Sequence, residues 1–218
     1  MTSAVEVGQR AALIGDVIRS RSAPDRSLLQ MHLEQALGEV NTALAPEQPL
    51  TVTIGDEFQG LFLTVEAAIE ATMQLRVGLA GRLDFRAGIG WGKLAFVDPE
   101  RVPLGQDGPC WWMAREALEL VVRNESSNRS PSSLRTACRF DEGDDRAHNA
   151  LLVLRDHILA TIDETDLVVL QSLLGGDTQK AAAEVLEVNQ SSVSRRMQTH
   201  GLAALLRVRE ILSKRAPF

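Results

Sequence analysis

Short apolar segments separated by polar turns predict strands in the N-terminal part of the chain. Residues 11–16 form an apolar run that ends at a Gly-Asp pair, which is typical of a buried strand. Residues 50–54 and 59–63 enclose a Gly-Asp-Glu-Phe turn and predict a β-hairpin. Residues 83–91 alternate between apolar and other residues, and the alternating glycines at 88, 90 and 92 indicate close approach of a backbone or a ligand.

Apolar residues at helical spacing predict helices at residues 27–44, 65–79, 112–122 and 146–162. Residues 134–140 predict one more strand, and the turn-forming residues before it indicate a loop. The order strand, helix, hairpin, helix, strand is the split βαβ arrangement of a ferredoxin-like palm domain.

The C-terminal part predicts helices only. Residues 163–174 carry an apolar helical stripe that ends at a pair of glycines. A second helix over 179–186 follows, with Thr178 as its cap, and a third helix begins at Gln190 after a tight turn. Two helices joined in this way predict a helix-turn-helix. The corner between them is expected to be filled by Val188 and Val193.

The predicted fold class is therefore α+β, with a ferredoxin-like palm domain followed by an all-α helix-turn-helix domain. We expect the palm domain over residues 1–140, a linker helix over 141–162 and the helix-turn-helix domain over 163–218.

Charge is distributed unevenly along the chain. The formal net charge is −6. From residue 178 onward, seven Lys and Arg residues stand against three Glu, whereas the rest of the chain has 16 basic and 26 acidic residues. An acidic body with a basic C-terminal part is expected when only that part meets double-stranded DNA. A solvated basic helix face would give the same charge pattern.

Composition indicates the cellular compartment to expect for the protein. Two cysteines make a poor disulfide framework, and no apolar run reaches the length of about 18 residues that a membrane span needs. Residues 1–10 lack the apolar region of a secretory signal, so we expect a cytoplasmic protein without a membrane partner. The four histidines show no metal-ligand spacing.

Asp16 and Asp56 are candidate metal ligands, because each follows a glycine at the end of a predicted strand. A hard cation such as Mg²⁺ binds one or two carboxylates together with phosphate oxygens. Clustered carboxylates repel one another, so a nearby cation would keep both ionised. The alternative is that each Asp only closes a turn, where Gly-Asp is common. Arg86, beside Asp84, is expected to make a structural ion pair.

Several segments follow one another in an order and spacing found in known families: IGDVIRSR at 14–21, IGDEFQG at 54–60, FRAGIGWG at 85–92, and DGP at 107–109 followed by AREAL at 114–118. They resemble the class III nucleotide cyclase and GGDEF catalytic folds and, more closely and over nearly the whole chain, the SatD family. The resemblance implies a nucleotide-cyclase-like palm, Mg²⁺ shared by Asp16 and Asp56, a nucleotide ligand, and a head-to-tail homodimer with the site between subunits.

The chain departs from the cyclase pattern at several positions. Val52 stands where cyclases carry the lysine that reads the base, and Trp111 or Trp112 stands where they carry the transition-state asparagine. Arg115 keeps the position of the arginine that faces phosphate. The resemblance therefore implies incomplete catalytic machinery. A retained nucleotide or phosphate pocket would use Arg19, Arg21 and Arg115, for which surface ion pairing is the alternative.

The second helix of the predicted helix-turn-helix presents short polar groups followed by cations, which suit base edges and phosphates in a major groove. The segment resembles the T-Q-x-x-x-A-x-x-L-x-x-x-x-x-x-V-S-R pattern of many bacterial regulators. The candidate DNA-binding residues are Thr178, Gln179, Gln190, Ser191, Ser192, Ser194, Arg195 and Arg196. A helical hairpin used only for dimerisation is the alternative.

These observations favour a DNA-binding transcriptional regulator whose acidic front half dimerises and senses a ligand such as a nucleotide with Mg²⁺. The second hypothesis is a metal-dependent nucleotidyl transferase or cyclase that uses Asp16 and Asp56. A third is a scaffold that dimerises through both halves and binds neither DNA nor nucleotide.

Overall fold

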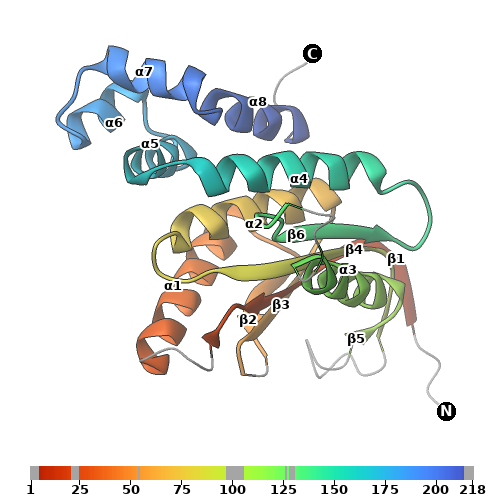
Figure 1. Cartoon of the computed structure of the whole chain (residues 1–218). Helices are drawn as coiled ribbons and strands as arrows, with labels where there is room; N and C mark the ends of the chain where they lie inside the picture. Colours follow the sequence, from red (N-terminus) through yellow and green to blue (C-terminus); the bar gives the residue numbers. More distant parts are fainter. Residues whose placement is uncertain are drawn as a thin grey trace. The chain divides into compact units, whose positions relative to one another are not determined.

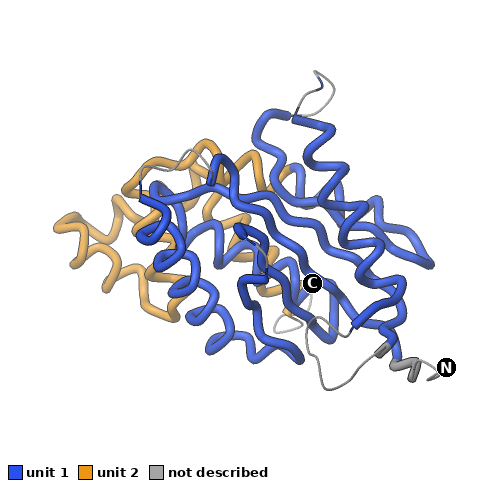
Figure 2. The backbone as a smooth tube through the Cα atoms, turned by 90° about the horizontal axis from the view of Figure 1, so that it is seen from below, with its two compact units in different colours: residues 1–153 blue, residues 154–218 orange. Residues whose placement is uncertain are grey.

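The computed structural model describes residues 5–20, 25–53, 55–96, 106–125, 127 and 131–213. The chain divides into two compact units, unit 1 over residues 1–153 and unit 2 over residues 154–218 (Figure 2). The border falls inside helix α4 (Arg146–Thr161), within the segment that the sequence assigned to a linker helix.

The described part of unit 1 contains a six-stranded sheet with the strand order β2-β3-β1-β4-β5, and β6 pairs with β4. The strands are β1 (Val5–Val17), β2 (Gln48–Val52), β3 (Glu57–Phe62), β4 (Phe85–Phe96), β5 (Gln106–Asp107) and β6 (Thr136–Phe140). Only the β4–β6 pair among them is parallel. β1 and β4 are longer than predicted because they pair with each other from Val5–Phe96 to Val17–Phe85.

Two helices alternate with these strands as the split βαβ plan requires. α1 (Arg26–Leu44) connects β1 to β2, and α2 (Val65–Leu79) connects β3 to β4. Each helix begins at a capping side chain: Asp25 accepts a hydrogen bond from the Leu28 amide, and Thr64 accepts one from the Ala67 amide.

Different helices cover the two faces of the sheet (Figure 1). Phe85 of β4 faces α2, where the Arg76 guanidinium carbon lies 5.9 Å from the centre of its ring. Gly88 faces α3 (Pro109–Glu125), because a Cβ atom added there would lie 2.1 Å from the Ala114 carbonyl oxygen. Since successive residues of a strand point to opposite sides, α2 and α3 lie on opposite faces.

A row of glycines on β4 allows α3 to pack closely. A Cβ atom at Gly90 would lie 2.1 Å from the Cys110 carbonyl oxygen, and one at Gly92 would lie 2.9 Å from the Cys110 nitrogen. The close approach that the alternating glycines indicated is therefore made by the backbone of α3.

Asparagine side chains pair with the backbone of two strands in place of a further strand. Asn41 of α1 accepts a hydrogen bond from the Leu50 amide at 2.7 Å and donates one to the Leu50 carbonyl at 2.9 Å. Asn149 of α4 does the same at Cys138 of β6, at 2.9 and 3.0 Å. At each residue one amide side chain satisfies both backbone groups.

Unit 2 contains α5 (Glu164–Leu174), α6 (Gln179–Val185), α7 (Gln190–Thr199) and α8 (Leu202–Leu212). Thr178 caps α6, as predicted. The four helices meet in an apolar core of Val169, Ala183, Val193, Met197 and Leu202. α8 was not predicted from the sequence. The prediction that Val188 fills the corner is wrong, because this residue is 43% exposed, whereas Val193 is buried as predicted. None of the described helices combines the length and the apolar composition needed to cross a membrane.

Candidate functional site

One end of the sheet in unit 1 gathers charged side chains from neighbouring strands. Asp16 on β1 is the direct cross-strand neighbour of Glu57 on β3 and of Arg86 on β4. Direct neighbours point to the same face, and Arg86 shares its face with Gly88, so this is the face that α3 covers. We call Asp16, Asp56, Glu57, Arg86 and Arg115 the acidic site.

Arginines hold two of the carboxylates of the acidic site. Arg86 donates to Asp16 at 3.0 Å and to Glu125 at 2.7 Å. Arg115, from α3, donates to both oxygens of Glu57 at 2.6 and 2.8 Å, the two-point geometry that favours an arginine–carboxylate pair. Asp84, the partner expected for Arg86, instead accepts from Arg76 and Arg135.

The positive charge does not fully compensate Asp16. Its pKa is raised above the ordinary 3.8, first because burial disfavours the charged carboxylate and second because Asp56 repels it; the Arg86 guanidinium opposes both effects. Asp56 itself accepts a hydrogen bond from the hydroxyl of Ser20. A cation bound next to Asp16 and Asp56 would favour the charged form of both carboxylates.

The two aspartates also retain oxygens that a hard cation could use. Arg86 contacts only Oδ2 of Asp16, and Ser20 contacts only Oδ2 of Asp56. Within the described residues, Oδ1 of each carboxylate thus has no hydrogen-bond donor. Two carboxylate oxygens suit Mg²⁺, which binds few protein ligands and keeps water or phosphate oxygens at its other positions.

Two cavities lie beside the acidic site, and Arg115 and Glu119 line both. The larger, of about 530 Å³, has the lining residues Ile14, Gln59, Gln106, Trp111, Trp112, Arg115, Glu116 and Glu119. The smaller, of about 360 Å³, is lined by Asp16, Glu57, Arg115, Leu118, Glu119, Val122 and Arg123. Two of the lining residues carry buried polar atoms, Nε1 of Trp111 and Oε1 of Gln106, that have no hydrogen-bond partner among the described residues.

The two adjacent tryptophans differ in environment. Trp111 packs against the core cluster that contains Ile14 and Ala114, whereas Trp112 is 57% exposed and donates to Asp107 at 2.7 Å. Of the arginines proposed for phosphate, Arg115 lines the cavities while bound to Glu57. Arg19 is exposed, with a positive φ of 58°, and Arg21 lies outside the described residues.

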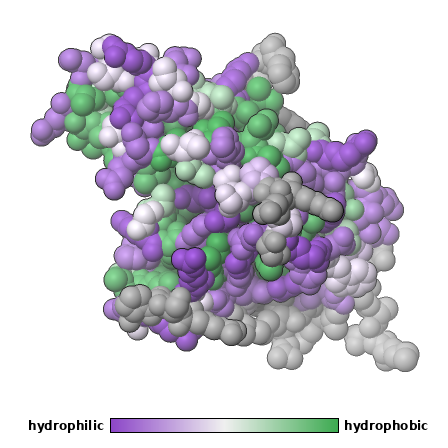
Figure 3. All heavy atoms as spheres, in the orientation of Figure 1, coloured by the Kyte–Doolittle hydropathy of each residue, from purple (hydrophilic) through white to green (hydrophobic). Residues whose placement is uncertain are grey.

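In unit 2, α7 has one buried and one exposed face. Val193 and Met197, one turn apart, enter the core. The exposed residues recur on the other side of the helix: Gln190, Ser191, Ser194, Arg195 and Gln198. We call this set the α7 face. In the view of Figure 3, hydrophilic side chains predominate where Figure 1 places α6 and α7.

The other predicted DNA-binding residues have different environments. Ser192 and Gln179 are half-buried, and the Thr178 hydroxyl accepts a hydrogen bond from the Ala181 amide. Arg196 points towards α5, where it donates to Asp163 and Asp166.

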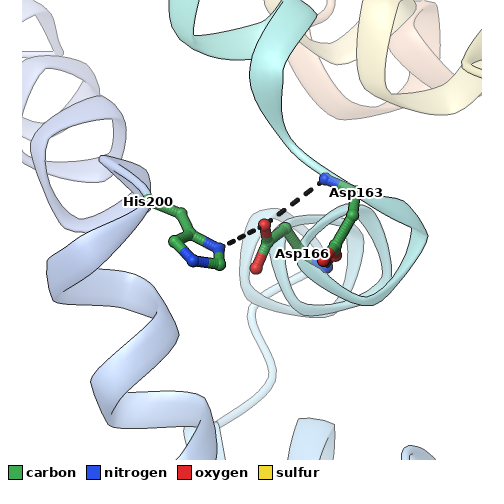
Figure 4. Close-up of side chains that lie close together, drawn as sticks. All are labelled: Asp163, Asp166 and His200. Carbon is green, nitrogen blue, oxygen red and sulfur yellow. Dashed lines mark hydrogen bonds and ion pairs between the residues drawn. The ribbon is translucent and has the colours of Figure 1, made fainter.

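His200 approaches the same pair of aspartates. Its Nδ1 lies 2.6 Å from Oδ2 of Asp166, and the two side chains face each other in Figure 4. One ligand-type atom from each of Asp163, Asp166 and His200 lies within 4.8 Å of the others. This group was not predicted, because His200 is far from Asp163 and Asp166 in the sequence. The spacing of Asp163 and Asp166, which is that of a capping box, was its only local signal. The Arg196 guanidinium already forms ion pairs with both of these carboxylates.

The structure thus defines a two-unit α+β protein with a split βαβ sheet in unit 1 and a cluster of helices in unit 2. The SatD family profile matches residues 10–214, and the chain belongs to this family. No curated protein matches the chain.

Among solved structures, the chain is similar to the guanylyl cyclase domain of the RhoGC fusion protein from the aquatic fungus Blastocladiella emersonii. The identity is 13%, over 54% of this chain and 77% of that one, with a TM-score of 0.42. Adenylate cyclase from Trypanosoma brucei is 17% identical, over 53% of this chain and 70% of that one, with a TM-score of 0.41. The adenylyl cyclase CyaB from P. aeruginosa is 14% identical, over 54% and 74%, with a TM-score of 0.39.

Proposed function

We propose that this protein is a DNA-binding transcriptional regulator in which unit 2 binds double-stranded DNA and unit 1 dimerises and binds a ligand. The observation that carries the proposal is the α7 face. Its side chains are polar, short or cationic and exposed along one side of a helix whose other side is fixed in the core. A helix of this kind can enter a major groove without losing its packing.

The side chains of α7 divide by the chemistry of their contacts. Gln190 offers an amide that can bind the edge of an adenine, and Ser191 and Ser194 offer hydroxyls to bases or phosphates. Arg195 supplies a cation for guanine or phosphate. Thr178 and Gln179 at the start of α6 complete the proposed contacts, together with Ser192. Arg196, the last residue of the predicted set, is instead bound to Asp163 and Asp166 at the start of α5.

The proposed ligand of unit 1 is a nucleotide with Mg²⁺. The Oδ1 atoms of Asp16 and Asp56, which have no hydrogen-bond donor among the described residues, would bind the cation, and the cavity of about 360 Å³ that Asp16 lines would receive the ligand. Arg115, with Arg19 and Arg21, would face phosphate, and Arg115 would then exchange Glu57 for the phosphate oxygens. A homodimer would bring two copies of α7 to two half-sites about one helical turn of DNA apart.

Selection of genomic DNA fragments by the full chain, followed by sequencing, tests the DNA-binding function. We expect recovery of a shared, roughly palindromic site at about 150 mM salt, where non-specific binding is weak. Arg195→Gln should lower recovery of this site, and the exposed Arg146→Gln in unit 1 is the matched control for the loss of one positive charge. Recovery that is uniform across the genome, or equal in the two variants, would contradict the proposal.

The second candidate is a metal-dependent cyclase or nucleotidyl transferase. It is favoured by the two neighbouring carboxylates Asp16 and Asp56, since burial and then repulsion by Asp56 raise the pKa of Asp16, and by the cavity of about 360 Å³ that Asp16 lines. Against it, Val52 stands where the cyclases that the sequence resembles carry the group that binds the base, and Trp111 or Trp112 stands where they carry the group that stabilises the transition state. Turnover of ATP or GTP with Mn²⁺ that is lost in Asp56→Asn would support this candidate, and absence of turnover would remove it.

A further inference from the structure

We propose that the two adjacent arginines of α7 have separate tasks. Arg195 contacts DNA, whereas Arg196 is a positioning residue that fixes α7 on α5 through Asp163 and Asp166. The inference rests on the proposed DNA-binding function of unit 2 and assigns the roles of residues within it.

Arg196 is held by both carboxylates at the start of α5. Its Nη1 donates to Oδ1 of Asp166 at 2.7 Å and to the two oxygens of Asp163 at 2.9 and 3.0 Å. The side chain of Asp166 is only 1% exposed. A buried carboxylate that loses its cation is left uncompensated, so moving Arg196 towards a phosphate would destabilise α5 and α7 together.

The carboxylate that receives Arg196 is itself fixed in place. The Asp166 amide donates to Asp163 at 2.9 Å, and the Asp163 amide donates in return to Asp166 at 3.4 Å, which forms a capping box. His200, just after α7, contacts the other oxygen of Asp166. The C-terminal end of α7 is therefore attached to the first turn of α5 at two points, Arg196 and His200.

Arg195 has the opposite environment. It is exposed and follows Ser194 on the α7 face, and it has no ion pair within the part of the chain that the structure describes. Arg195 can thus displace counterions from DNA without breaking internal contacts, whereas Arg196 cannot. Per subunit, the pair should count as one phosphate contact in the salt dependence of binding.

The test measures DNA affinity at several salt concentrations for the full chain and for Arg195→Gln, Arg196→Gln and Asp166→Asn, using a fragment recovered by genomic selection. Arg195→Gln should weaken binding and reduce the salt slope by about 1 per subunit. Arg196→Gln and Asp166→Asn should weaken binding with the slope of the unmodified chain. Their double variant should be no weaker than the stronger-acting single variant, because both break the same contact.

Amide hydrogen exchange without DNA provides the second readout. Arg196→Gln should speed exchange in α7, whereas Arg195→Gln should leave it unchanged. If Arg196→Gln does not fold, Arg196→Lys replaces it, since an ammonium keeps the charge but not the planar donor geometry. It should also speed exchange in α7 and keep the salt slope.

A salt slope reduced by the Arg196 variant as much as by Arg195→Gln, with unchanged exchange in α7, would overturn the inference. If the unmodified chain binds no DNA, the proposed function of unit 2 fails. Exchange in α7 that is unchanged by the Arg196 variant would then overturn the positioning role as well, and faster exchange would leave that role standing without the DNA contact.

Discussion

The acidic site of unit 1 and the α7 face of unit 2 distribute their charges in opposite ways. In unit 1, carboxylates bind both arginines of the acidic site, and Asp56 adds a further negative charge beside them, bonded to the Ser20 hydroxyl. In unit 2, carboxylates hold Arg196, and the exposed charge left on α7 is the positive Arg195. The comparison teaches that an arginine's role follows from its partners rather than from its place in a motif.

The largest expected loss of stability comes from a substitution that disturbs the packing of unit 1 and leaves the residues of the α7 face unchanged. Gly90→Ala would place a methyl group 2.1 Å from both the Cys110 carbonyl oxygen and the Ala114 nitrogen. Backbone atoms cannot rotate away, so we expect a loss of about 3 kcal/mol in the free energy of unfolding. The urea unfolding midpoint of the full chain measures this loss.

Gly38→Ala in α1 is the matched control, because no heavy atom outside its own helix lies within 4 Å of its added Cβ. In an open helical position, alanine should instead stabilise the protein by about 0.5–1 kcal/mol. Equal midpoints for the two variants would show that α3 does not pack on β4 as closely as described.

The next effect concerns the packing of α7. Val193→Ala removes two fully buried methyl groups from the core of unit 2, which should lower the free energy of unfolding by about 2 kcal/mol and weaken DNA binding. Val188→Ala removes the same atoms from a side chain that is 43% exposed and should change it by less than about 0.5 kcal/mol. Thermal unfolding of the two variants measures the difference, and a larger loss at Val188 would reverse the assignment of the helix corner.

The smallest expected effect is that Asp16 and Asp163 contribute to folding stability with opposite pH dependence. The folded-state pKa of Asp16 lies above 3.8, so the folded state binds that proton more tightly than the unfolded state does. Its contribution to stability therefore falls as pH rises through the window between 3.8 and the raised pKa. Asp16→Asn should remove this fall.

Asp163 should behave in the opposite way. Hydrogen bonds from the Asp166 amide and then from Arg196 lower its folded-state pKa below 3.8. Its stabilising contribution is complete above pH 3.8 and is lost as pH falls through the folded-state pKa. Urea unfolding of both Asn variants between pH 3 and pH 7 measures the two slopes. The same sign in both variants would show that the charge balance of the two units does not differ as proposed.

Local signals in the sequence predicted much of the fold. The apolar stripe of α2 and its Thr64 cap define a helix whose observed bounds, Val65–Leu79, are those predicted. The ends of β1 and β4 were missed because their length depends on pairing with each other, and the apolar pattern does not extend over the paired residues. α8 was missed because the residue before it, Gly201, has no side chain that could cap the helix.

The contacts of the candidate sites were harder to predict. The partner of Arg86 depends on the register of three strands, so the adjacent Asp84 was the natural but wrong choice. The position of Arg196 depends on the crossing of α5 and α7, which no local pattern in the sequence specifies. Asp16 and Asp56 were found because a Gly-Asp pair after an apolar run is a local signature, but their use as metal ligands stays a prediction.

The asparagine side chains at Leu50 and Cys138 have a consequence for assembly. A strand edge with open amides and carbonyls is a template on which a second chain can add a strand and start aggregation. Asn41 and Asn149 occupy that template at one residue of β2 and one of β6. Growth of the sheet into a neighbouring copy at either residue would first have to break two hydrogen bonds. These two amides would therefore hinder the addition of a strand to β2 or β6 at these residues.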